Sequence, residues 1–198
     1  MRRSSRYMIL LASLLLGLVY LFPMWHISLK APQYPEGLGL YIHVSDITGQ
    51  GPHDLQNING LNHYIGMKAI EPGSIKELEY MPIIVGVMMV LGIVVAATGN
   101  RTALYLWVAA FLVVALAGLV DFWMWEYDYG HNLNPHAAIK VPGMSYQPPL
   151  IGSKKLLNFT ASSWPTIGGL AAMASVAIGA LVALSEWRSG RASVEPGR

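Results

Sequence analysis

Residues 81–120 read MPIIVGVMMVLGIVVAATGNRTALYLWVAAFLVVALAGLV, and this stretch decides the fold. Two apolar runs, 81–98 and 103–120, flank a short turn that contains Arg101. Each run is close to the about 20 residues that an α-helix needs to cross roughly 30 Å of hydrocarbon. The stretch therefore predicts two transmembrane helices joined by a tight turn.

Two further apolar runs, 7–22 and 165–184, lie near the ends of the chain, which is 54% hydrophobic and only 12% charged. The first follows a basic segment and ends at Phe22-Pro23-Met24-Trp25, whereas signal-peptide cleavage sites carry small residues. We expect a retained signal anchor there. The fold class predicted from this pattern is an all-α membrane protein with four transmembrane helices.

Charge sets the predicted orientation. If the N-terminus is cytoplasmic, the cytoplasmic pieces are residues 1–6, the turn 99–101 and the segment 186–198. These pieces hold all the arginines of the chain, which are Arg2, Arg3, Arg6, Arg101, Arg188, Arg191 and Arg198. Because basic residues favour the cytoplasmic side, both termini are predicted to be cytoplasmic.

The predicted organisation follows from these spans. It consists of a signal-anchor helix (1–25), a first extracytoplasmic loop with a strand and a helix (26–80), transmembrane helices two and three (81–120), a second extracytoplasmic loop (121–163), a fourth transmembrane helix (164–187) and a cytoplasmic tail (188–198). In the first loop, alternating apolar residues predict a strand over 38–44, and Asp54 is placed to begin a helix. The two loops are expected to form a small ordered domain in which the second covers the first.

The candidate functional residues lie in these two loops. On a helix, His63 and Met67 would stand one above the other, at positions i and i+4. His131, His136 and Met144 in the second loop could complete a ligand set. Imidazole and thioether donors together favour copper, Cu(I) in particular. The open alternatives are surface histidines bonded to backbone carbonyls and methionines that only fill the core.

Other features exclude function classes. The chain has no cysteine, so disulfides, thiolate metal sites and covalently attached haem are excluded. Its basic residues are too scattered for a nucleic-acid surface. No hydrolytic or nucleotide-binding motif stands out, so the chain is not predicted to be an enzyme. Asp121, Glu126 and Asp128 follow the third span. They could supply oxygen ligands or orient a ligating imidazole, but a solvated helix end is the favoured interpretation.

The fourth span carries small residues at four-residue spacing. These are Ala171, Ser175, Gly179 and Ala183. Such a stripe lets another helix approach closely. The sequence leaves open whether that helix belongs to this chain or to a partner subunit.

Three motifs carry a resemblance: NHYIGM at 62–67, YDYGHNLNP at 127–135 and VPGMSYQPP at 141–149. In these motifs the chain resembles a group of uncharacterised bacterial polytopic membrane proteins associated with gene neighbourhoods for copper delivery to nitrous oxide reductase. The resemblance implies a protein of the bacterial inner membrane that handles copper on its periplasmic face.

Three functions are therefore open. The first is a copper-handling or maturation factor that presents a His/Met site for delivery to a periplasmic acceptor or a membrane metalloenzyme. The alternative is a structural accessory or assembly subunit of a membrane complex, with no metal site of its own. The third is a redox-enzyme subunit that contacts quinone or haem near His26 and residues 123–129.

Overall fold

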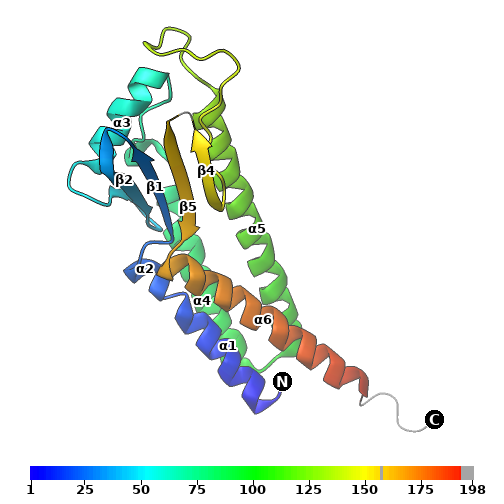
Figure 1. Ribbon diagram of the computed structural model, residues 1–198. Coiled ribbons are helices and arrows are strands. Elements are labelled where there is room, and N and C mark those ends of the chain that lie inside the picture. Colours follow the sequence, from blue (N-terminus) through cyan, green and yellow to red (C-terminus); the bar gives the residue numbers. More distant parts are fainter. Residues whose placement is uncertain (157, 193–198) are drawn as a thin grey trace.

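The computed structural model describes residues 1–156 and 158–192 and places a bundle of long helices below a β-sheet (Figure 1). The helices are α1 (Arg3–Leu15), α2 (Leu18–Leu21), α3 (Asp54–Ile65), α4 (Glu77–Thr98), α5 (Arg101–His131) and α6 (Ile167–Ala192), with a 3₁₀ turn at Pro72–Ser74. The strands are β1 (Trp25–Ala31), β2 (Tyr34–Ile42), β3 (Ile47–Gly49), β4 (Gly152–Leu156) and β5 (Phe159–Pro165).

Four helical segments are long and apolar enough to cross a membrane, in agreement with the predicted spans. They are Arg3–Leu21, Glu77–Thr98, Arg101–His131 and Ile167–Gly190. Because α5 has 31 residues and about 20 suffice for a bilayer, its last turns continue beyond the bundle and run beside the sheet (Figure 1). The predicted tail begins at residue 188, but α6 stays helical to Ala192. The rest of that tail, 193–198, lies outside the described residues.

The prediction of an all-α fold is wrong. The five strands form one antiparallel sheet in the order β3-β2-β1-β5-β4, so the protein is mixed α and β. The strand predicted over 38–44 corresponds to the second half of β2, and the helix predicted from Asp54 is α3. The predictions missed β1, which lies next to the first span, and found no strand in the second loop, which contributes β4 and β5.

The outer core lies between this sheet, α3 and the upper turns of α5. Its buried residues are Trp25, Ile27, Leu38, Leu40, Ile47, Ile58, Ile70 and Tyr129. The indole N–H of Trp25 donates to Ser163 Oγ at 2.7 Å, which ties β1 to β5. We call this unit, residues 25–71 together with residues 121–165, the sheet domain.

The small-residue stripe of α6 packs within the chain. The hydroxyl of Ser175 donates to the carbonyl of Ala12 on α1 at 2.7 Å. A Cβ added at Gly179 would lie 3.0 Å from the Trp107 ring of α5. The question that the sequence left open is therefore answered for these two positions, which are both buried against neighbouring helices of the same chain.

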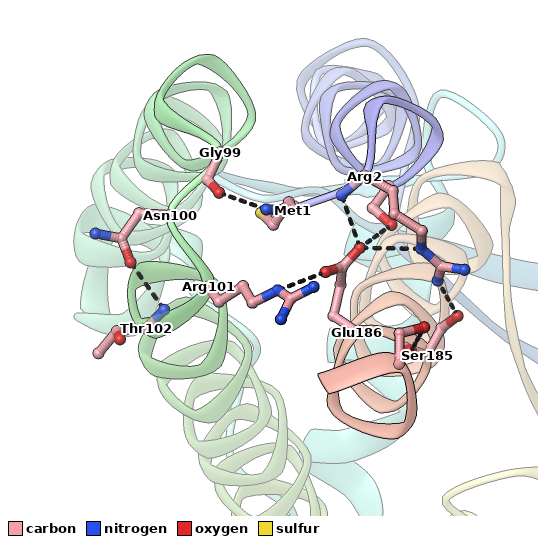
Figure 2. Close-up of polar contacts among 10 residues, drawn as sticks. Met1, Arg2, Gly99, Asn100, Arg101, Thr102, Ser185 and Glu186 are labelled. Carbon is pink, nitrogen blue, oxygen red and sulfur yellow. Dashed lines mark hydrogen bonds and ion pairs between the residues drawn. The ribbon is translucent and has the colours of Figure 1, made fainter. Parts of the chain in front are cut away.

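A buried carboxylate closes the end of the bundle that lies opposite the sheet. Glu186 is 0% exposed and accepts hydrogen bonds from Arg2 N–H at 3.0 Å, Ser5 Oγ at 2.6 Å and Arg101 Nε at 2.9 Å (Figure 2). The Arg2 guanidinium adds a fourth contact at 3.2 Å. The sequence placed Glu186 at the start of a cytoplasmic segment. In the structure this residue also links α6 to the N-terminus of α1 and to the start of α5.

Candidate functional site

The first candidate pair, His63 and Met67, does not share a helix face. α3 ends at Ile65, and Gly66 adopts a left-handed conformation with φ 84°. This reversal directs Met67 into the apolar core of the sheet domain, whereas His63 remains exposed. The expected i, i+4 arrangement is therefore wrong, because the helix stops before its second member.

The segment that follows α5 folds back onto the end of α3. The N–H of Asn134 donates to the Gly66 carbonyl at 2.8 Å, and the N–H of Ile139 donates to the Tyr64 carbonyl at 2.9 Å. These bonds confirm that the second loop covers part of the first. They also place exposed His63 and exposed His136 on adjoining segments, at the opposite end of the molecule from the N-terminus (Figure 1).

His131 is the last residue of α5 and is held in a defined orientation. Its Nδ1 lies 3.0 Å from the Tyr127 carbonyl, and its ring stacks on Tyr127 with centroids 4.0 Å apart. Because a carbonyl oxygen only accepts, Nδ1 must donate, which leaves Nε2 as the lone-pair nitrogen of the neutral ring. Met144 is half-buried within the same irregular segment.

The described residues, 1–156 and 158–192, contain no group of three or more His, Asp or Glu side chains placed to hold a metal ion. The histidines differ in their partners. His26 bonds to Gln50 at 3.0 Å and His43 to Thr48 at 3.2 Å, both through Nε2. His63 and His136 are exposed, with no side-chain hydrogen bond among the described residues. Any metal held by imidazole here would therefore sit at an open surface.

A second feature, absent from the sequence-based predictions, is a cavity of about 80 Å³ inside the sheet domain. Its walls come from β1, β2, α3, the upper turns of α5 and the segment around Tyr146. They are mainly aliphatic and aromatic, and they include Met67. The candidate ligand Met67 thus belongs to this interior space and not to the histidine-bearing surface.

Glu126 is the acidic group on the cavity wall. It is 0% exposed, and neither of its carboxyl oxygens has a hydrogen-bond partner among residues 1–156 and 158–192. Burial raises its pKa to about 8, because a low-dielectric site disfavours the charged form. The residue lies on the part of α5 that runs beside the sheet, beyond the predicted span. The interpretation of Glu126 as part of a solvated helix end is therefore wrong.

The spacing of aromatic residues along α5 indicates that the Glu126 side chain is buried. Phe122 lies four residues before it and Tyr129 three residues after it, so all three share one helix face. Phe122 packs against the outer core and Tyr129 belongs to it. The apolar face of α5 thus continues past the predicted span and includes Glu126.

The other titratable groups on the cavity wall are phenols. They are Tyr34 on β2, Tyr129 on α5 and Tyr146 on the segment that crosses α5. The Tyr146 hydroxyl is, like the Glu126 oxygens, buried without a hydrogen-bond partner among the described residues. Among the residues that the structure describes, no lysine, arginine or histidine lines the cavity. The wall therefore offers no positive charge to an ionised Glu126.

The segment that carries Tyr146 is seated on a glycine of α5. The N–H of Tyr146 donates to the Gly130 carbonyl at 2.9 Å, and a Cβ at Gly130 would lie 2.5 Å from Gln147 Cα. No side chain fits in this space. Gly130 therefore allows the segment to close over the cavity.

The same substitution at two glycines is expected to have opposite effects. Gly130→Ala should lower the free energy of unfolding by about 1–3 kcal/mol, because the new methyl group meets backbone. Gly60→Ala on α3, where a Cβ would meet nothing within 4 Å, should raise it by about 0.5–1 kcal/mol through helix propensity. Chemical unfolding of both variants in detergent measures the difference. Equal effects at the two positions would contradict the packing described here.

Comparison with known proteins adds no assignment: the sequence matches no protein-family model, and no curated protein matches it.

Proposed function

We propose that the protein is a copper-handling or maturation factor of the bacterial inner membrane, which binds the ion on its periplasmic face and passes it to an acceptor. The observation that carries the proposal is the joining of two histidine-bearing segments by backbone hydrogen bonds. Asn134 and Ile139 bond to the carbonyls of Gly66 and Tyr64, which keeps His63 and His136 on neighbouring exposed segments.

Exposed imidazoles suit transfer of a metal ion from one protein to another. Handover requires ligands that a partner can reach and replace one at a time. His63 and His136 are exposed, and the hydrogen bond from Nδ1 of His131 leaves its Nε2 able to coordinate. We assign the imidazoles of His63 and His136 to the site, with Met144 as a further donor. His131 is not placed with them, because the described residues contain no group of three His, Asp or Glu side chains around one ion. Met67 is left out because it packs into the sheet domain.

The charge distribution supports the proposed orientation. The turn between α4 and α5 and the N-terminal segment carry arginines, and both lie at the end of the bundle opposite the sheet (Figure 1). By the positive-inside rule that end is cytoplasmic. The sheet domain then faces the periplasm, where a soluble copper acceptor can meet it.

The test compares histidines that differ in their partners. Cu(I) affinity of the purified protein, measured against a competing chelator under reducing conditions, should fall at least about tenfold in His63→Ala and His136→Ala, because each change removes a ligand. The matched controls are His26→Ala and His43→Ala, whose rings are engaged with Gln50 and Thr48. Equal losses in all four variants, or none, would reject the assignment.

A second candidate is the accessory or assembly subunit, and it has an observation of its own. Apolar side chains are exposed beside the histidines: Tyr64 is 57% and Ile139 50% exposed. Exposed apolar side chains that adjoin one another are typical of protein contacts. In this case Tyr64→Ser with Ile139→Ser should abolish association with a purified partner subunit of the membrane complex. The histidine variants would leave that association unchanged.

A further inference from the structure

We propose that the cavity beside Glu126 is a binding site for a small organic cation, such as a quaternary ammonium ion or a short alkylamine. This site is separate from the histidine-bearing surface and does not depend on the copper proposal. Three observations carry it: an unpartnered buried carboxyl group, the absence of any positive side chain on the cavity wall, and a wall rich in aromatic rings.

The buried carboxyl group of Glu126 favours a positively charged ligand. Glu126 is fully buried and neither oxygen is hydrogen-bonded within the protein. Buried carboxylates in folded proteins are normally paired with a cation or with hydrogen-bond donors. The residues that line the cavity include no lysine, arginine or histidine. A cationic ligand would supply the counter-charge that the ionised form of Glu126 lacks, and an anionic ligand is disfavoured for the same reason.

The aromatic rings define what kind of cation fits. Five aromatic residues line the cavity, namely Tyr34, Trp125, Tyr129, Tyr146 and Phe159. Cations bind to the faces of such rings, and alkylated ammonium ions fit best because their methyl groups also match an apolar wall. A hydrated inorganic ion would instead need several oxygen ligands, whereas Glu126 is the one carboxyl group on this wall.

The size and position of the cavity limit the ligand further. A volume of about 80 Å³ restricts the ligand to a small ion with a few carbon atoms. The exposed residue Gln33, in the turn between β1 and β2, is among the lining residues. The cavity therefore reaches the surface of the sheet domain at that turn.

The pH dependence distinguishes a cation from a neutral ligand. A cation pairs with the ionised carboxylate, so binding releases the proton that Glu126 holds below its pKa of about 8. Affinity should then rise about 50-fold from pH 6 to pH 8 and level off above. A neutral ligand that accepts a hydrogen bond from the protonated acid would show the opposite trend. The phenols of Tyr34, Tyr129 and Tyr146 are the other titratable groups that face Glu126.

Calorimetric titration of the full-length protein in detergent with tetramethylammonium chloride tests the site. Binding should be measurable at about pH 8.5 and should follow the pH profile above. The affinity for tetramethylammonium should fall at least about tenfold in Glu126→Gln. That variant keeps the shape of the side chain, and its circular dichroism reports whether the fold is retained. Glu71→Gln, at an exposed carboxylate of the same domain, is the matched control and should bind as the wild type does.

Uncharged tert-butanol, which is similar in shape, provides the second comparison and should bind at least about tenfold more weakly at high pH. The proposal is overturned if tetramethylammonium gives no binding signal with the wild type at about pH 8.5. It is also overturned if Glu126→Gln binds equally well, or if tert-butanol binds as tightly as the ion. A Trp125→Leu variant should weaken binding of the ion, and unchanged affinity there would reject the aromatic contribution.

Discussion

Between about pH 5 and pH 8, the wild-type protein is expected to lose stability relative to its Glu126→Gln variant, by up to about 4 kcal/mol. Burial raises the pKa of Glu126 from 4.5 to about 8, so the folded protein retains a proton that the unfolded chain releases above its ordinary pKa. The contribution is fully present at low pH and disappears as pH rises through that window. The glutamine side chain cannot ionise, so the variant should lack this loss.

The measurement is chemical unfolding of both proteins at a series of pH values, with the difference between them as the readout. The difference cancels the contribution of the other carboxylates to the pH dependence of stability, because they titrate in both proteins. Glu71→Gln, at an exposed site, should track the wild type across the series. A constant offset between Glu126→Gln and wild type would show that Glu126 is ionised in the folded state.

Glu186→Ala is expected to lower the free energy of unfolding by about 2–4 kcal/mol. The change removes the acceptor of four contacts, from the backbone and guanidinium of Arg2, from Ser5 and from Arg101. The buried Ser5 hydroxyl would be left without this acceptor. The two arginine side chains are 49% and 45% exposed and can return to water, which limits the loss.

Unfolding in mixed micelles with increasing denaturing detergent measures this effect. Glu79→Ala, on the exposed surface of α4, is the control and should change the free energy by no more than about 0.5 kcal/mol. Glu186→Gln should fall between wild type and Glu186→Ala, because an amide oxygen still accepts from Ser5. If both Glu186 variants behave as the Glu79 control does, the network adds nothing to stability.

Hydropathy predicted the bundle well because a membrane span is a local property of the sequence. A run such as 103–120 needs no knowledge of its neighbours to be recognised. The helix start at Asp54 predicted α3 in the same way, since a helix closes its hydrogen bonds within itself. These elements could be placed from sequence for the same physical reason.

The sheet was not predicted because its strands are stabilised by partner strands that are distant in the sequence. β1 is a short segment flanked by the first span and by Pro32, and β5 contains threonine and serine in place of a regular apolar alternation. Each is stabilised by the other, with Trp25 opposite Pro165 and Ile27 opposite Ser163. Strand preference is set largely by such neighbours. From the local sequence alone, residues 121–163 are therefore predicted to be an irregular loop.

The candidate site was predicted in part. The sequence brought His63 and His136 into one hypothesis, and the structure places their segments in contact through Gly66 and Asn134. It could not show that Gly66 would end the helix and turn Met67 inward, because glycine is tolerated within helices as well as at their ends. Copper binding itself stays a prediction.

The central strands of the sheet come from opposite ends of the chain, with Trp25 paired to Pro165. During synthesis, β1 must therefore wait until the ribosome has made β5, when three of the four spans have already been produced. Its unpaired edge is open to wrong partners in the meantime. Biogenesis of this protein should accordingly be sensitive to slow translation or premature termination anywhere before residue 165.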